Sequence, residues 1–155
     1  MKTLGIINCC KKKVGKGYAI DVYQGTLFKL LLKYVSLKCN NIKILSSKYG
    51  LIDLQTIIEL YDVVFFKQYI AKNTNTIVLS SKEKKEWAQK VYNDLQNEIK
   101  KYDELHFYIN IYFMQYLKPI LDKNKVNYKW FKFEGCLGKN ISKYQKLLEK
   151  ENDKH

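Results

Sequence analysis

Short apolar runs alternate along this chain with longer segments whose apolar residues recur every three to four positions. The runs at 4–9 and 42–45 are apolar almost throughout, as in strands buried on both faces of a sheet. Between them, over 22–37, apolar side chains recur at helical spacing with lysines on the other side. A strand, a helix and a strand in this order predict a right-handed parallel unit.

The second half of the chain continues the alternation. Ser80 and Glu83 have capping-box spacing, which predicts a long amphipathic helix from Ser80 to about Lys101. Four further elements are expected: a buried strand at 105–109, a helix at 112–121, a strand nearer a sheet edge at 127–133 and a last helix at 141–150. Pro119 is expected to kink or shorten the end of its helix. Together the elements predict an α/β fold, a three-layer, open, mostly parallel sheet of the Rossmann-like type with helices on both faces.

The length of 155 residues suits one ordinary domain, which we expect at 1–150, followed by a short polar tail at 151–155. The stretch 46–76 is expected to be irregular, and within it 62–71 is compatible with a short helix or a strand. Apolar runs are much shorter than the roughly 20 residues of a membrane span, and the first nine residues are too few for a secretory signal. We therefore expect a cytoplasmic protein without a membrane partner.

The charge of the chain is strongly positive and unevenly distributed. The chain has 28 lysines, no arginine and 15 acidic residues, which give a net charge of +13. Residues 1–50 hold 10 lysines and one acid, Asp21, so most of the excess lies in the first third. Such a field attracts the phosphates of nucleic acid or of a nucleotide. The alternative is that lysine serves mainly as a solvated cation in a protein from an AT-rich genome.

Four cysteines, Cys9, Cys10, Cys39 and Cys136, lack the spacing of a disulfide framework. Reduced thiols are therefore the simpler interpretation. A structural zinc site usually needs paired ligands two to four residues apart, which the adjacent Cys9 and Cys10 with the distant His106 do not provide. We expect neither a metal nor another cofactor.

Polar side chains follow each of the first two expected strands. In an open parallel sheet, ligands bind beyond the carboxyl ends of the strands where strand order reverses, so these two loops should face one crevice. Their residues are Asn8, Cys9, Cys10 and Lys11 to Lys13 in the first loop and Ser46, Ser47, Lys48, Tyr49 and Gly50 in the second. Thiols, hydroxyls, lysines and free amides suit a phosphate or a polar base. Neither loop has the glycine spacing of a Walker or dinucleotide motif.

Three residues in or near these loops are candidates for catalysis. Cys9 or Cys10 could be a nucleophile because nearby lysines favour a thiolate, although a cysteine at a strand end is more often a small buried hydrophobe. Asp62 is the preferred general acid or base, with Glu59 the other nearby carboxylate. His106 lies inside an expected strand and is better explained as a hydrogen-bonded core residue.

Other residues in or near the two loops are candidates for binding. Lys48 could neutralise a phosphate, and Tyr49 and Tyr61 could stack on a base, although most of the 13 tyrosines must be packing residues. Gly50 is expected to adopt a positive backbone torsion that lets the chain turn sharply.

Three motifs resemble a family of small uncharacterised phage and bacterial domains. They are CCKKK after the first strand, AIDVYQGTLFK at 19–29 and ILSSKYGLI at 44–52, with Tyr61–Asp62 following. The family usually has Cys-Ser-Lys-Lys in the first motif, where Cys10 replaces the serine, and Leu-Ser-Ala-Lys-Tyr-Gly-Leu in the third. The resemblance covers nearly the whole chain. It implies site residues at Cys9, Lys11, Tyr23, Phe28, Ser46, Lys48, Tyr49, Gly50, Tyr61 and Asp62.

The same motifs are similar, more distantly, to YaaA-type peroxide-stress proteins and to the catalytic module of archaeosine synthase, which modifies a deazaguanine base in transfer RNA. These relatives imply nucleic-acid binding or nucleobase chemistry and do not fix one reaction. We expect an enzyme or enzyme-like domain that acts on a nucleobase, nucleotide or nucleic acid. Base modification or N-glycosidic-bond chemistry, by a transferase or a hydrolase, is the leading hypothesis. In it Lys11 and Lys48 hold phosphate, and Ser46 and Ser47 bond the base or sugar. The alternatives are a noncatalytic stress or phage-encoded factor that binds DNA or RNA, and a protein-interaction module.

Overall fold

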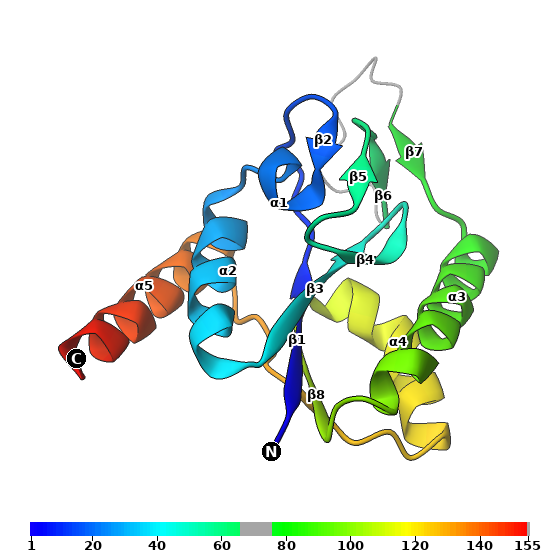
Figure 1. The fold of residues 1–155 in the computed structure, drawn as a ribbon. Helices are drawn as coiled ribbons and strands as arrows, with labels where there is room; N and C mark the ends of the chain where they lie inside the picture. Colours follow the sequence, from blue (N-terminus) through cyan, green and yellow to red (C-terminus); the bar gives the residue numbers. More distant parts are fainter. Residues whose placement is uncertain (66–75, 155) are drawn as a thin grey trace.

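A five-stranded sheet forms the centre of the computed structural model, which describes residues 1–65 and 76–154 (Figure 1). Its strand order is β4-β3-β1-β8-β9. The strands are β1 (Thr3–Asn8), β3 (Asn41–Ser46), β4 (Gly50–Asp53), β8 (Glu104–Tyr108) and β9 (Tyr128–Trp130). All neighbours are parallel except β4, which runs antiparallel to β3. The expected α/β fold with a mostly parallel sheet is confirmed.

Long helices flank the sheet. Helices α2 (Thr26–Lys38) and α5 (Leu137–Asp153) pack against each other on one side, and α3 (Ser81–Ile99) and α4 (Ile111–Lys123) pack against each other on the other (Figure 1). A single-turn helix, α1 (Ala19–Val22), precedes α2. Two small ribbons lie near the carboxyl ends of the parallel strands. They pair β2 (Gly17–Tyr18) with β5 (Ile57–Ile58) and β6 (Val63–Val64) with β7 (Ile77–Val78). No helix in the described ranges is long and apolar enough to cross a membrane.

Several expected boundaries are corrected by the structure. Helix α2 begins at Thr26 rather than 22, because α1 and the extended Tyr23 and Gly25 come first. Helix α4 continues past Pro119 to Lys123, since buried Leu117 and Leu121 on either side of the proline hold it to the core.

The last helix is longer than expected at both ends. Cys136 is the N-cap of α5, so the helix starts at Leu137, four residues before the expected start at 141. It also runs to Asp153, so most of the expected polar tail is helical. Glu151, in that stretch, pairs with Lys38 of α2, which fixes the final turns against the molecule.

The stretch 46–76 is more ordered than expected where the structure describes it. It contains β4 at the sheet edge, which the sequence analysis missed because Gly50 to Asp53 is too short to show alternation. Of the undecided segment 62–71, β6 is a short strand and 66–71 lies outside the described residues.

The close approach of β1 and α2 requires a glycine at position 5. An added Cβ at Gly5 would lie 2.2 Å from Cγ1 of Val35, which is fully buried and cannot move aside. We expect Gly5→Ala to lower the free energy of unfolding by about 1–3 kcal/mol, as overpacked cores usually do. Gly17→Ala is the matched control, because its Cβ would meet only Val22 at 3.8 Å. Urea unfolding that shows equal stability for both variants would contradict this packing.

Candidate functional site

The loops after β1 and β3 meet at the carboxyl edge of the sheet, as the sequence analysis predicted. Asn8 and Leu45 are partners in the β1–β3 register, and the backbone amide of Cys9 donates to the carbonyl of Leu45 at 3.0 Å. On the other side of β1, the Asn8 side chain accepts a hydrogen bond from the amide of Asn110, the N-cap of α4. The first loop is therefore fixed to both neighbouring strands.

A hydrogen-bonded group of hydroxyls lies at the centre of this edge. The Ser46 hydroxyl donates to the Tyr61 oxygen at 3.0 Å, and the hydroxyls of Tyr61 and Tyr23 lie 2.6 Å apart. Ser46 also accepts hydrogen bonds from the amides of Lys48 and Tyr49. Ser46 and Tyr23 are fully buried, whereas Tyr61 is half-buried. Tyr61 is the partly exposed residue of the three, and hydrogen bonds from Ser46 and with Tyr23 hold its hydroxyl in place.

Helix α3 holds the turn that carries Ser46 and Tyr49 in place. The indole Nε1 of Trp87 donates to the carbonyl of Ser46 at 2.8 Å, and Nζ of Lys90 donates to the carbonyl of Tyr49 at 2.7 Å. Both pairs are 41 residues apart in the chain. Sequence reasoning missed Trp87 and Lys90 as supports, since only the tertiary fold brings them to the turn.

Gly50 closes the turn in the way that was predicted. Its φ of +74° lies in the left-handed region, and its pairing with Ser46 starts the antiparallel β3–β4 ladder. The Ser47 hydroxyl donates to the carbonyl of Val63 at 2.6 Å, which ties the turn to β6. Ser47 is also buried, so its hydroxyl is not free to contact a ligand in this conformation.

Lysines and aromatic rings face each other beside the hydroxyl group. Nζ of Lys13 lies 4.3 Å from the ring centroid of Tyr61, and Nζ of Lys48 lies 5.2 Å from that of Tyr49. The two tyrosine rings meet edge to face, with centroids 5.5 Å apart. Lys48 is exposed and both rings are half-buried, so a ligand can reach this part of the site. Lys11, also exposed, belongs to the same first loop.

The ionisable groups at the centre remain protonated at neutral pH. Burial raises the pKa of the Cys9 thiol, and the Ser47 amide, the Lys13 charge and the Tyr61 hydroxyl counteract this only in part. Burial, followed by the proximity of Cys9 and Tyr23, raises the pKa of Tyr61. The site therefore offers neutral hydrogen-bond donors, with positive charge at its side.

The three predicted catalytic residues have different environments. Cys9 adjoins the hydroxyl group, as the influence of Tyr61 and Ser47 on its pKa shows. The Cys10 thiol instead donates to the carbonyl of Lys12 and accepts from the amide of Gly25 at the start of α2. The Asp62 carboxylate is exposed and accepts a hydrogen bond from Thr76. The structure thus places the Cys9 thiol against the hydroxyl group, whereas hydrogen bonds hold the Cys10 thiol to Lys12 and Gly25.

His106 has structural partners on both sides of its ring. Its Nε2 lies 2.6 Å from Glu104 and its Nδ1 lies 3.7 Å from the Cys39 sulfur. Burial raises the pKa of the Cys39 thiol, which disfavours a nucleophile there. The arrangement fits the expected hydrogen-bonded core histidine. In the described part of the chain, no group of three or more His, Cys, Asp or Glu side chains is placed to hold a metal ion.

Comparison with known proteins places the chain in a family. The model of a family of unknown function (DUF6884) matches residues 4–146. The chain belongs to this family. The matched range includes every residue of the site described above, and the match agrees with the resemblance to a small uncharacterised domain. No curated protein and no solved structure matches, so the likeness to YaaA-type proteins and archaeosine synthase rests on the sequence motifs alone.

Proposed function

We propose that this DUF6884 chain is an enzyme or enzyme-like domain that acts on a nucleobase, nucleotide or nucleic acid, by base modification or N-glycosidic-bond chemistry. In this proposal the central sheet with helices on both sides is a three-layer Rossmann-like fold, in which ligands bind beyond the carboxyl ends of the strands. One observation carries it: the hydroxyl of half-buried Tyr61 is held by Ser46 and Tyr23 next to Cys9, with the Lys13 ammonium over the Tyr61 ring.

Each part of the site suits a part of a nucleotide. The half-buried rings of Tyr49 and Tyr61 provide aromatic surface on which a base can stack. The exposed Lys11 and Lys48 provide cations for a phosphate. Ser46 and Ser47 are buried and hydrogen-bonded, so in this proposal they position the turn and do not contact the base themselves.

The protonated groups favour acid catalysis over attack by a thiolate. When an N-glycosidic bond breaks or a base is modified, negative charge develops on ring nitrogen or oxygen atoms. A preorganised Tyr61 hydroxyl donates a hydrogen bond to such an atom, and a Cys9 thiol can do the same more weakly. Asp62 follows Tyr61 directly in the chain and is exposed, so it is the carboxylate proposed to exchange a proton with water or substrate.

A noncatalytic DNA- or RNA-binding role is the second candidate. It is supported by the net charge of +13 and its concentration in the first third of the chain. A binder of this kind recognises the phosphate backbone and needs no particular hydroxyl group at the sheet edge.

A thermal-shift panel of nucleotides, nucleosides and deazapurines, with duplex DNA alongside, separates the two. The enzyme proposal predicts that at least one small ligand, present at about 100 times its Kd, stabilises the protein by about 2.7 kcal/mol. That corresponds to a rise in Tm of roughly 5–10 °C for a chain of this size. Tyr61→Phe should remove most of the rise, and Asp62→Asn should keep it while abolishing turnover of that ligand.

Stabilisation by duplex DNA alone, unchanged in both variants, would exclude the enzyme proposal and leave the binder. Tyr18→Phe is a matched control for Tyr61→Phe, because Tyr18 is an exposed tyrosine in β2, away from the hydroxyl group.

A further inference from the structure

Four lysines form one row along the exposed side of α5. Lys139, Lys143, Lys146 and Lys150 are spaced by four, three and four residues, so they lie within about 60° of one another around the helix. At 1.5 Å per residue the row is about 16 Å long. These lysines line a shallow hollow of 590 Å³ together with Asn140 and Ser142.

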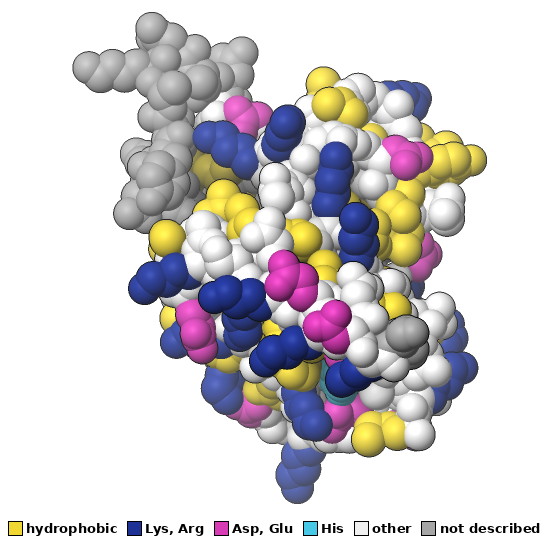
Figure 2. Space-filling view, turned by 90° about the vertical axis from the view of Figure 1, so that its left-hand side faces the viewer, with side chains coloured by type: hydrophobic (Ala, Val, Ile, Leu, Met, Phe, Trp, Pro, Cys, Tyr) yellow, Lys and Arg dark blue, Asp and Glu magenta, His cyan; other side chains and the backbone are white. Residues whose placement is uncertain are grey.

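The row has almost no acidic partner. Glu134 is the acidic residue that lines the hollow, and none of the four lysines forms an ion pair within residues 1–65 and 76–154. Some helical lysines elsewhere do form ion pairs, as Lys118 does with Asp122 one turn away on α4. Figure 2, which faces the α5 side, shows more lysine than acidic side chains over this face, with acidic side chains lying between the lysines.

The row does not contribute to the stability of α5. Like charges at i and i+4 weaken a helix, and a lysine in the first turn opposes the helix dipole. The helix is held instead by its other side, where buried Tyr144 packs with Tyr34 and Tyr108. Asn140, also buried, fixes the preceding loop by accepting from the Glu134 amide and donating to the Cys136 carbonyl. The lysine row therefore lies on a helix that is held firmly to the molecule.

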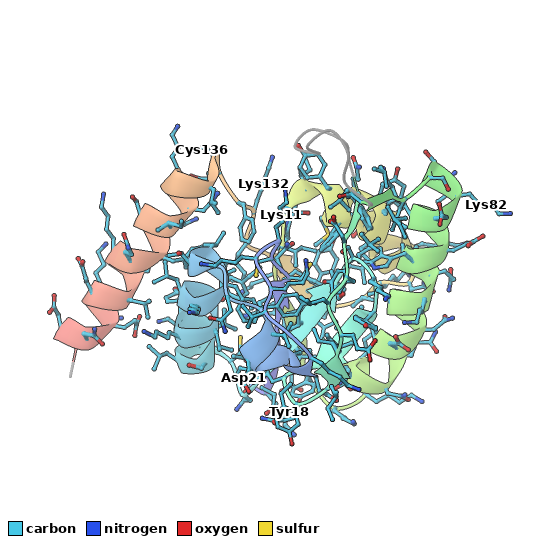
Figure 3. The ribbon with its side chains drawn as sticks, turned by 90° about the horizontal axis from the view of Figure 1, so that it is seen from above. Lys11, Tyr18, Asp21, Lys82, Lys132 and Cys136 are labelled. Atoms are coloured by element: carbon cyan, nitrogen blue, oxygen red, sulfur yellow. The ribbon has the colours of Figure 1, made fainter. Side chains whose placement is uncertain are left out.

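The helix start adds further positive potential at one end of the row. The amides of Lys139 and Gly138 lower the pKa of the Cys136 thiol, so they favour negative charge beside the N-cap. Looking onto the carboxyl ends of the parallel strands, Figure 3 shows Lys132 and then Lys11, in the loop after β1, between Cys136 at the start of α5 and the middle of the molecule. Lys82 of α3 lies on the opposite side.

We infer that the lysine row on α5 binds the phosphate backbone of a polynucleotide. A row of about 16 Å matches roughly four or five phosphates of one duplex strand, at 3.4 Å of helix axis each. A membrane surface fits less well, because interfacial helices expose an apolar face and that of α5 is buried against α2. The inference rests on the proposed function and narrows its substrate from any nucleotide to a nucleotide within a strand.

The test compares two triple variants with the same loss of charge. Lys143→Gln/Lys146→Gln/Lys150→Gln removes most of the row, and Lys82→Gln/Lys85→Gln/Lys100→Gln removes three exposed lysines of α3 and its C-terminal end. Binding of a fluorescein-labelled 20-base-pair DNA and of a 20-nucleotide RNA is followed by anisotropy at several salt concentrations. Circular dichroism confirms that both variants fold.

The row variant should bind both probes about tenfold or more weakly at 0.1 M salt. Its slope of log K against log salt for the duplex should become shallower by about 2 to 3, since each phosphate contact contributes about 0.9. The α3 variant should stay within about twofold of the wild type. Equal weakening in both variants would mean that only net charge matters and would overturn the inference, as would binding to anionic phospholipid vesicles with none to either probe.

Mononucleotide binding separates this inference from the proposed function. The row variant should show the same thermal shift with a stabilising mononucleotide as the wild type, because the hydroxyl group around Tyr61 is intact. Loss of polynucleotide binding with that shift retained supports both claims. Unchanged polynucleotide binding in the row variant overturns the inference alone, whatever the mononucleotide does.

Discussion

Iodoacetamide at pH 7 should alkylate Cys136 about 100-fold or more faster than Cys9, because the thiolate is the reacting species. Cys136 is exposed, and the backbone amides at the start of α5 lower the pKa of its thiol. Burial acts in the opposite direction on Cys9, so the Cys9 thiol remains protonated until the pH rises above its ordinary pKa. The Cys9 rate should therefore continue to rise with pH after the Cys136 rate has levelled off.

Mass spectrometry of peptides sampled over time measures both rates in one reaction. Urea-unfolded protein is the control, since the two thiols should then react at similar rates. Faster labelling of Cys9 than of Cys136 in the folded protein would mean that Cys9 is a thiolate, and the acid role proposed for the site would give way to a nucleophilic one.

Trp87→Ala should lower the free energy of unfolding by about 3–5 kcal/mol, the range for removal of a large aromatic residue from a core. The Trp87 ring is buried against Phe65 and Phe113, and its Nε1 holds the carbonyl of Ser46. The substitution opens a cavity between α3, α4 and the sheet. It also leaves a buried carbonyl without its hydrogen bond.

Trp87→Phe separates packing from hydrogen bonding. It should cost less than the alanine variant, about 1–3 kcal/mol, because a ring remains while the donor is lost. If the indole also positions the candidate site, Trp87→Phe should weaken the mononucleotide thermal shift as well. Urea unfolding of the two variants, with exposed Tyr18→Ala as the control, gives the comparison. Equal stability of Trp87→Ala and the wild type would contradict the packing described for α3.

The strands and long helices were predictable because their signals are local. The apolar runs of β1 and β3 and the Ser80–Glu83 capping box of α3 need no tertiary information. The limits of α4 and α5 were not predictable in the same way. Helix α4 crosses Pro119 because its neighbours are buried, and the end of α5 depends on a contact between Glu151 and Lys38, 113 residues apart.

The candidate site was predictable as two loops but not as a network. The rule for parallel sheets brings Cys9 and the Ser46–Gly50 turn to one edge, and the structure does so. Which hydroxyls are buried depends on distant partners. Ser46 is enclosed by Tyr61 and Trp87, so it supports the site instead of facing a ligand. The lysine row was also overlooked, since lysines that recur on one side of a last helix are typical of an ordinary solvated surface.

The most direct test of the central claim is an amide NMR titration of the protein with the four ribonucleoside 5′-monophosphates. If the hydroxyl group around Tyr61 is the ligand site, at least one nucleotide should shift the amides of Cys9, Lys48 and Tyr49, and Tyr61→Phe should abolish the shifts. Nucleotides that leave these amides unchanged, or that perturb only the lysine row on α5, would contradict the account.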